Sequence, residues 1–411
     1  MYLKLTSGIH SLLVTGVDVV SIAASARRAG YKVFSVDFYG DLDLRHLCKE
    51  SLSIIHQCLG KSCGLFERDY KINLLLKLVK KLLKKHKVDG VVFGSGLEDN
   101  PWVLKDINDM TPVIGNTSEL LVKVRNKTKF FQTLRQLGIP HPQTTVVYDF
   151  DEAKKCVKDW GYPIVLKPLT GFGGSEVQRI ECEKELKEAF DTVASPNKGY
   201  LVQEYISGIP ASVSLISTSE DVVALSVNEQ LLGVKRLGML NPFGYCGNIV
   251  PLSSSMQVFK SCKTVAERII SHFGLVGSNG VDFVVSKEGI PFVMEVNPRF
   301  QGTLECVERV YGVNVVKAHV EACVDRRLLR KTFVSRGFCT RLILYSPQRT
   351  VVPDLRVFFG VRNVPLIGAI VEEGEPLCSI TSVGTTREAS LRKGQNVAES
   401  IFKALLPSHP R

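Results

Sequence analysis

Residues 281–300 read VDFVVSKEGIPFVMEVNPRF, which is the pattern of a β-hairpin made of two apolar strands. The Glu288–Gly289 pair suits a two-residue turn between them. This turn places Asp282 directly opposite Glu295 on the partner strand. Because side chains alternate with period two, Asn297 shares a face with Glu295. The stretch therefore predicts a hairpin that presents two carboxylates and an amide.

The two carboxylates of this hairpin repel each other across the strand pair, and their neighbours are apolar. A half-buried acidic pair of this kind needs a cation. The oxygen ligands Asp282, Glu295 and Asn297 favour Mg²⁺ or Mn²⁺ over zinc. The alternative is that the carboxylates pair with nearby arginines such as Arg299. Of the two, we predict the metal site.

A second element lies upstream, in YPIVLKPLTGFGGS at residues 162–175. A strand ends at Lys167 and is followed by a loop that contains Gly171, Gly173 and Gly174. Backbone N–H groups of such a loop can surround phosphate oxygens while the lysine supplies positive charge. Taken alone, the loop could also be a flexible hairpin tip. It is not a P-loop, in which the lysine follows the glycines.

The N-terminal third alternates strands and helices. Buried strands are expected in HSLLVTG (10–16), YKVFSVDF (31–38) and VDGVVFGSG (88–96). This alternation predicts an open parallel sheet covered by helices. Gly16 stands alone, without the further glycines of a GxGxxG turn, so a dinucleotide site is not expected. We expect Asp37 to cap a strand end or to contact a small substrate.

Taken in order along the chain, these elements resemble the ATP-grasp superfamily, and in particular its carboxylate–amine ligase and biotin-carboxylase-like branches. The resemblance covers about residues 10–330. The motifs that carry it are NKTKFFQTLRQLGIP (126–140), YPIVLKPLTGFGGS (162–175), LVQEYISG (201–208), GVDFVV (280–285) and MEVNPRFQG (294–302).

The resemblance implies an α/β protein with three parts. An open parallel-sheet pre-ATP-grasp (Rossmann-like) domain is expected at 1–116. A two-part α+β ATP-grasp domain is expected at 117–330, with its glycine-rich lid at about 163–205. The residues from 331 to 411 are β-rich and are expected to form a small appended domain.

The resemblance also implies a role for each matching residue. Lys127 and Lys167 would hold the phosphates of ATP beneath the glycine loop, and the three oxygen ligands of the hairpin would hold magnesium on them. Arg299 would face the reacting carboxylate or the developing acyl phosphate. Backbone groups of four residues would form a hinge along the adenine edge: Gln203, Glu204, Tyr205 and Ile206. The acidic ribose ligand common after this hinge is replaced here by Ala211 and Ser212.

The activity that we predict is an ATP-dependent ligation of a carboxylate to an amine through an acyl phosphate. One alternative is an ATP-dependent carboxylase acting on bicarbonate, but Thr303 stands where a biotin carboxylase has a glutamate. A nucleotide-binding regulatory module without turnover is a second alternative. The residues proposed to contact the small-molecule acid and amine, each of which could equally be an ordinary surface charge, are Glu229, Lys235, Arg236 and Glu305.

Composition limits the remaining possibilities. The chain has 411 residues, of which 45% are hydrophobic and 23% charged, as in ordinary globular proteins. The net charge is +11, but six lysines lie on one helix, residues 77–87, so no nucleic-acid partner is expected. Eleven scattered cysteines indicate neither disulfides nor zinc. Without a membrane span or signal peptide, we expect a cytoplasmic protein that could form a homodimer.

Overall fold

The computed structural model describes residues 8–169, 171, 173–174, 176–192, 199–329 and 333–407. Its N-terminal part is a four-stranded sheet in which all neighbours are parallel, in the order β3-β2-β1-β4. The predicted open parallel sheet is confirmed. Because β1 is followed by β2 on one side and by β4 on the other, the strand order reverses between β1 and β4. The strands are β1 (Ser11–Thr15), β2 (Lys32–Asp37), β3 (Ser51–Ser53) and β4 (Gly90–Phe93).

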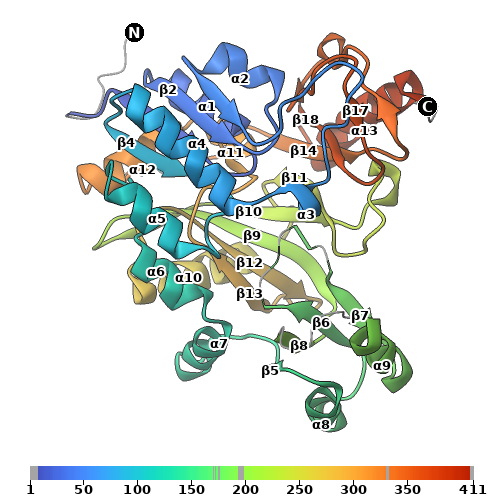
Figure 1. The fold of residues 1–411 in the computed structure, drawn as a ribbon. Coiled ribbons are helices and arrows are strands. Elements are labelled where there is room, and N and C mark those ends of the chain that lie inside the picture. Colours follow the sequence, from blue (N-terminus) through green and yellow to red (C-terminus); the bar gives the residue numbers. More distant parts are fainter. Residues whose placement is uncertain are drawn as a thin grey trace.

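Helices cover both faces of this sheet (Figure 1). The lysine-rich helix α4 buries Leu75, Val79 and Leu82 against the sheet, whereas most of its lysines are exposed. The expectation of a basic, solvated helix face is therefore confirmed. The N-terminal helices are α1 (Val20–Arg28), α2 (Leu42–Leu47), α3 (Phe66–Asp69), α4 (Ile72–Lys85) and α5 (Pro101–Asn108).

The central element is an antiparallel eight-stranded sheet in the order β13-β12-β9-β10-β11-β14-β18-β16. All of its neighbouring strands are antiparallel. The last three strands come from the segment expected as an appended domain, so in the structure that segment extends the central sheet. The strands are β9 (Gly208–Ser217), β10 (Val222–Leu232), β11 (Tyr245–Val250), β12 (Gly277–Ser286), β13 (Pro291–Asn297), β14 (Phe338–Tyr345), β16 (Val361–Arg362) and β18 (Pro376–Gly384).

The hairpin β12–β13 pairs its acidic residues as predicted, although its turn is not the predicted two-residue turn. Next to the turn, Val285 pairs with Pro291, whereas a two-residue turn at Glu288–Gly289 would pair it with Phe292. Asp282 pairs with Glu295, and Gly280 pairs with Asn297. A register shift after Asp282 marks a β-bulge, a feature that re-aims side chains and is common next to active sites. The two carboxylates therefore lie opposite each other, as the sequence predicts.

Three helix boundaries of the ATP-grasp segment depend on single residues. Residues 118–136 form two helices divided at Asn126, whose side chain accepts a hydrogen bond from the Lys129 N–H and so caps the second helix. Ser255 caps the helix that begins at Met256, because its side chain accepts from the Val258 N–H. Gly312, with φ of +66°, ends the helix that begins at Leu304. These helices are α6 (Ser118–Arg125), α7 (Lys127–Gln136), α10 (Met256–Phe273), α11 (Leu304–Tyr311) and α12 (Val315–Val324).

A smaller antiparallel sheet, in the order β5-β8-β6-β7, projects away from the N-terminal sheet with two helices on it (Figure 1). It contains the expected lid segment and also β5, which lies upstream of residue 163 and pairs with β8. The elements are β5 (Thr144–Val147), α8 (Phe150–Trp160), β6 (Ile164–Pro168), β7 (Gln178–Ile180), α9 (Glu183–Thr192) and β8 (Tyr200–Glu204).

Near the end of the described chain, the long helix α13 packs on β14 and β18. The three-stranded sheet β17-β15-β19 lies beside it. These elements lie next to the N-terminal sheet (Figure 1). No helix within the described ranges is long and apolar enough to cross a membrane. The remaining elements are η1 (Lys235–Leu237), β15 (Thr350–Val351), η2 (Leu355–Val357), β17 (Ile370–Val371), α13 (Arg387–Ala404) and β19 (Leu406–Pro407).

Candidate active site

A cavity of about 530 Å³ lies where the N-terminal sheet, the central sheet and the small β5-β8-β6-β7 sheet meet. The strand ends of the N-terminal sheet, the face of the central sheet, the small sheet and the C-terminal segment all contribute to its wall. It brings together all of the residues predicted for the site: Lys127, Lys167, Gly171, Gly173, Gly174, Gln203, Glu204, Tyr205, Ile206, Asp282, Glu295, Asn297 and Arg299.

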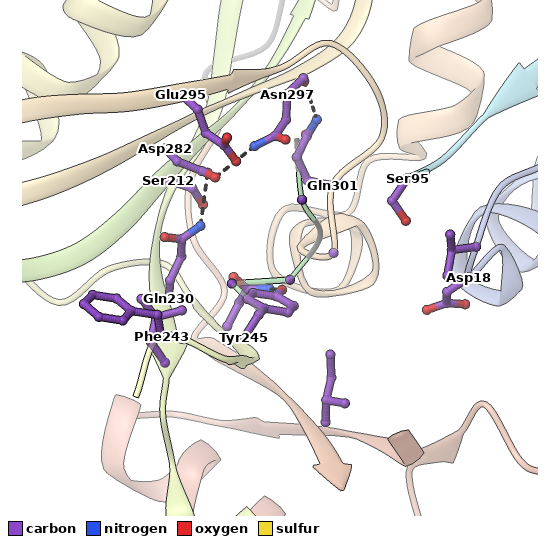
Figure 2. A pocket seen from close by; sticks show the side chains of 18 of the residues that line it. Asp18, Ser95, Ser212, Gln230, Phe243, Tyr245, Asp282, Glu295, Asn297 and Gln301 are labelled. Atoms are coloured by element: carbon purple, nitrogen blue, oxygen red, sulfur yellow. Dashed lines mark hydrogen bonds between the residues drawn. The ribbon is translucent and has the colours of Figure 1, made fainter. Parts of the chain in front are cut away.

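The hairpin residues form one side of this cavity (Figure 2). Both carboxylate oxygens of Asp282 accept hydrogen bonds: Oδ1 from Gln230 Nε2 at 3.0 Å and Oδ2 from Asn297 Nδ2 at 2.9 Å. Burial, together with the negative charge of Glu295, raises the pKa of Asp282 to about 7. Asp282 and Glu295 thus lie close together, and the charged form of Asp282 is unfavourable in this environment.

Glu295 is stabilised by cations that the sequence did not single out as partners of the acidic pair. Lys127 Nζ lies 3.1 Å and Arg125 Nη1 3.8 Å from its Oε2 atom. Burial opposes ionisation, but the positive charges of Lys127, Arg125 and Lys167 hold the pKa of Glu295 well below its ordinary value. Glu295 therefore has an arginine within ion-pair distance, as in the alternative to a metal site. That arginine is Arg125, however, whereas Arg299 pairs with Glu98.

The donor set fits a hard divalent cation. Asp282, Glu295 and Asn297 present two carboxylates and one amide to the same cavity wall, and oxygen atoms are the ligands that Mg²⁺ prefers. No group of three or more His, Cys, Asp or Glu side chains able to hold a metal occurs in the part of the chain that the structure describes.

Lys167 lies at the end of β6 and is held by two polar side chains of the small sheet. Its Nζ atom donates to Gln203 Oε1 at 2.9 Å, and Gln203 Nε2 donates to Thr144 Oγ1 at 2.8 Å. Burial, with added repulsion from Lys127, lowers the pKa of Lys167 to about 8. An anion placed between the two lysines would relieve this repulsion. The Gln203 side chain is buried beneath the lysine, so only its backbone is available for a hinge role.

The glycine loop lies over the cavity and is attached to the segment before β11. The Tyr245 N–H donates to the Gly173 carbonyl at 3.0 Å, and Asn241 Nδ2 donates to the Gly174 carbonyl at 3.0 Å. A Cβ atom at Gly174 would lie 2.1 Å from the Phe243 carbonyl oxygen, so no larger residue fits. The other loop positions, 170, 172 and 175, lie outside the described residues.

The predicted hinge connects the small sheet to the central sheet. Glu204 ends β8, and its carboxylate accepts from the Gln143 N–H at 3.1 Å. The guanidinium of Arg179 lies over the Tyr205 ring, 4.2 Å from its centroid. Tyr205 and Ile206 lie in the connection between β8 and β9 and line the cavity. The side chains of Glu204 and Tyr205 thus have protein partners.

Arg299 reaches from the hairpin to the N-terminal sheet. Its Nε atom donates to Glu98 Oε1 at 2.6 Å, and the other Glu98 oxygen accepts from the Gly96 N–H at 2.6 Å. Next along the chain, Asp99 accepts from Arg125 Nε at 2.6 Å. Two acidic residues that follow β4 therefore position two arginines of the ATP-grasp segment. The signal for them was present in the sequence, as a carboxylate pair directly after a buried strand and glycine loop.

The residues suggested for substrate contact do not line the cavity. Glu229 forms an ion pair with Arg387, with Nη2 and Oε1 2.5 Å apart. Lys235 and Arg236 lie in η1 and are exposed. Glu305 pairs with Arg309 at 2.7 Å. Asp37, for which a strand-end cap or a substrate contact was expected, is buried and accepts from Ser53 Oγ and the Gly40 N–H, which is the capping role.

Comparisons with known proteins agree with this architecture. Residues 124–303 match the model of the ATP-grasp domain. An uncharacterized protein of Methanocaldococcus jannaschii is 26% identical over 376 residues, covering 90% of this chain and 87% of that protein. The carbamoyl phosphate synthase large chain of Helicobacter pylori is 24% identical over 253 residues, covering 60% of this chain. The aligned part is 23% of that enzyme, so this chain spans only a fraction of its length.

Solved structures share the fold over nearly the whole chain. Biotin carboxylase from Campylobacter jejuni, solved with an ATP analogue, has a TM-score of 0.76 at 18% identity, covering 97% of this chain and 92% of that one. N5-carboxyaminoimidazole synthase from Aspergillus clavatus, solved with ADP and an aminoimidazole ribonucleotide, has a TM-score of 0.72 at 15% identity, with coverages of 96% and 99%. At these identities the likeness shows the fold. Residues 124–303 therefore carry an ATP-grasp domain, and the chain as a whole shares its fold with these solved structures.

Proposed function

We propose that this protein is an ATP-dependent ligase that joins a carboxylate to an amine through an acyl phosphate. The observation that carries the proposal is the charge arrangement around Asp282 and Glu295. Four cationic side chains of the cavity wall surround these two carboxylates: Arg125, Lys127, Lys167 and Arg299. Such a site suits a polyanion that arrives with a divalent cation. Phosphoryl transfer depends mainly on positioning and on neutralising charge, which this wall supplies.

The nucleotide would lie between the small sheet and the hairpin. Lys127 and Lys167 would contact its phosphates, and the backbone between residues 203 and 206 would follow the adenine edge. Asp282, Glu295 and Asn297 would hold Mg²⁺, which neutralises phosphate charge when it is bound. Lys127 now pairs with Glu295, so it is already at the place where phosphate and metal would meet.

The chain's own residues would then guide two displacements. An oxygen of the substrate carboxylate attacks the γ-phosphorus and ADP leaves, while Arg299 neutralises the approaching negative charges. The amine next attacks the acyl carbon and phosphate leaves, which forms the amide. Arg299 is suited to this position because Glu98 fixes its side chain, so little reorganisation is needed.

A carboxylase acting on bicarbonate is the second candidate, since the solved structures of the same fold include a biotin carboxylase. A carboxylase needs a base to deprotonate bicarbonate. Thr303 lines the cavity at the corresponding position, is buried, and exchanges a hydrogen bond with Ser214 Oγ at 2.8 Å. A hydroxyl cannot serve as that base at neutral pH, whereas a carboxylic acid substrate is already ionised there. This difference favours the ligase.

The experiment is trapping with hydroxylamine. We expect hydroxamate to form from ATP, Mg²⁺ and a member of a carboxylic acid panel, and we expect bicarbonate alone not to stimulate ADP release. Bicarbonate-stimulated ADP release without hydroxamate from any acid would favour the carboxylase. Nucleotide binding with no ADP release under any condition would favour a regulatory module. Size-exclusion chromatography coupled to light scattering would test the proposed homodimer.

A further inference from the structure

The cavity continues beyond the nucleotide end to the carboxyl edge of the N-terminal sheet. Asp18 follows β1 and Ser95 follows β4, the two strands between which the strand order reverses. Both residues line the cavity and face the hairpin from its opposite side (Figure 2). Open parallel sheets bind ligands in the crevice outside the strand ends at such a reversal. The chain therefore has a second binding region in the same cavity.

Carboxylates outnumber cations in this second region. Asp18 Oδ2 accepts from Arg341 Nη2 at 3.0 Å, and Asp18 Oδ1 accepts from Asn363 Nδ2 at 2.8 Å. The same Asn363 amide also donates to Asp41 Oδ2 at 3.1 Å. Asn363 has φ of +55°, a conformation that costs energy and places its amide between the two acids. Arg341 is the single cation shared by this network.

Asp41 lacks a cationic partner. It is 6% exposed, lines the cavity, and forms no ion pair among the described residues. Burial raises the pKa of its carboxyl well above the ordinary value, and the charges of Asp37 and Asp18 raise it further. A ligand ammonium group at this place would supply the missing positive charge.

Arg341 provides an independent indication of a ligand. Its side chain lies in the cavity wall and the residue is only 5% exposed. Its Nη1 and Nη2 atoms have acceptors, but its Nε–H has none within the described chain. A buried donor without an acceptor is costly. The Nε atom itself is enclosed by protein, so a ligand would bind at Nη1, which carries two hydrogens and has one acceptor in the described chain, the Gly302 carbonyl at 3.3 Å. A ligand oxygen, such as that of a carboxylate, would accept the second Nη1 hydrogen.

Beside polar residues such as Gln57 and Ser379, this region has an apolar and aromatic wall. Six residues from the N-terminal and C-terminal parts of the chain form it: Tyr39, Ile343, Tyr345, Pro365, Val371 and Leu377. A hydrocarbon side chain would bury its surface here, which is favourable at about 25 cal/mol per Å². A ligand that fits this region therefore needs three groups: an ammonium, an oxygen that accepts a hydrogen bond, and an apolar body.

We propose that the crevice between β1 and β4 binds the amine substrate of the ligase, and that this substrate is an apolar α-amino acid. The inference rests on the proposed function. Asp18 and Asp41 receive the ammonium, Arg341 Nη1 receives the carboxylate, and the apolar wall receives the side chain. In the reaction the amino nitrogen forms the C–N bond as the C–O bond to phosphate breaks. One ammonium proton leaves with the phosphate and one passes to solvent.

The test is calorimetric titration of the full chain with three related ligands: L-phenylalanine, 2-phenylethylamine and 3-phenylpropionate. The last two lack the carboxylate and the amine, respectively. We expect L-phenylalanine, or another member of a set with L-leucine, L-methionine and L-valine, to bind about tenfold or more tightly than its truncated analogues. Equal binding of all three related compounds, or no binding by any of these probes, would overturn the proposal.

Substitutions test which side chain of the protein binds which group of the amino acid. Asp41→Asn keeps an acceptor for Asn363 but removes the charge, so it should weaken the amino acid about tenfold or more. Asp43→Asn is the matched control, because Asp43 lies two residues away, accepts from the Val364 N–H and does not line the cavity. Its effect should stay within about twofold. Arg341→Lys should weaken L-phenylalanine but leave 2-phenylethylamine unchanged. Equal losses in the two aspartate variants would contradict the assignment.

Hydroxylamine separates this inference from the proposed function, because hydroxylamine is a small uncharged nucleophile that does not need the amino-acid site. Hydroxamate formation without amino-acid binding would refute the amino-acid site but support the ligase activity. Amino-acid binding without hydroxamate from any acid would remove the ligase and leave the site.

Discussion

The two ends of the cavity use charge in opposite ways. At the hairpin, two carboxylates are surrounded by four cationic side chains, and Glu295 is so well neutralised that its pKa falls. At the strand ends of the N-terminal sheet, the one arginine pairs with Asp18, Asp41 forms no ion pair among the described residues, and the pKa of Asp41 rises. The first arrangement suits a polyanion with its metal, and the second suits a cationic amine. Electrostatics alone would thus keep the two substrates in separate places.

The largest effect is expected at Arg299, which belongs to the cationic end. Arg299→Ala should lower hydroxamate formation about 100- to 1,000-fold, because it removes a fixed positive charge where negative charges approach. Steady-state rates with saturating ATP measure this. Arg387→Ala is the control, since Arg387 is paired to Glu229 away from the cavity and its loss should leave the rate unchanged. A similar loss in both variants would show that the effect is structural.

The next effect concerns His319, whose ring joins the backbone of β12 to the backbone of the segment that follows α5. Its Nδ1 atom accepts from the Ser278 N–H at 2.7 Å, and its Nε2 atom donates to the Ile114 carbonyl at 2.8 Å, so the ring is neutral. Burial lowers the pKa of His319 to about 4. Because the folded-state pKa lies below the unfolded value of about 6.5, its stabilisation is complete above pH 6.5 and is lost as pH falls toward 4.

This loss should reach about 3 kcal/mol at pH 4, at 1.36 kcal/mol per pKa unit. Urea unfolding at several pH values should show a steeper acid loss for the natural protein than for His319→Gln. The exposed His46→Gln variant should follow the natural protein. If His319→Gln shows the same acid loss, then His319 is not the responsible group.

A smaller effect is expected for nucleotide binding. Lys167→Ala should weaken ATP binding by about 1.5–3 kcal/mol, the usual contribution of a charge-assisted hydrogen bond to phosphate. Calorimetry with Mg²⁺-ATP measures this. The variant should leave L-phenylalanine binding unchanged, because Lys167 belongs to the other end. Unchanged ATP affinity would exclude Lys167 as a phosphate ligand.

The smallest effect separates the two carboxylates of the hairpin. Glu295→Gln should lower the free energy of unfolding by about 1 kcal/mol, since it breaks the contacts to Lys127 and Arg125 at a side chain that is 36% exposed and partly screened. Asp282→Asn should raise stability slightly, because it removes the strained member of the pair. Thermal melts without Mg²⁺ test this difference in sign, and equal shifts would contradict it.

The residues predicted from the sequence lie together at the hairpin end of the cavity, whereas the residues of the other end were hardly predicted at all. The pairing of Asp282 with Glu295 was predicted from residues that are close together in the chain, although the structure reaches it with a turn one residue longer than predicted and a β-bulge after Asp282. Lys167 and the glycines are likewise contiguous in the chain. These local patterns need no knowledge of tertiary structure.

The amino-acid end is assembled from residues far apart in the chain. Asp18, Arg341 and Asn363 meet only because the last strands extend the central sheet back to the N-terminal sheet. Each residue alone resembles an ordinary surface charge or turn residue. The same reason explains why Glu98 was missed as the partner of Arg299, since 201 positions separate them. The candidates Lys235 and Glu305 failed because local charge does not reveal which side chains reach a cavity.

The most direct test of the account follows one oxygen atom. With an acid that gives hydroxamate, both carboxylate oxygens are labelled with ¹⁸O, and the reaction is run with ATP, Mg²⁺ and L-phenylalanine or the amino acid that binds best. The account predicts that one labelled oxygen appears in inorganic phosphate and the other in the amide, because the carboxylate attacks the γ-phosphorus before the amine attacks carbon. Amide that forms while the released phosphate carries no label would contradict the acyl phosphate and the division of the cavity that rests on it.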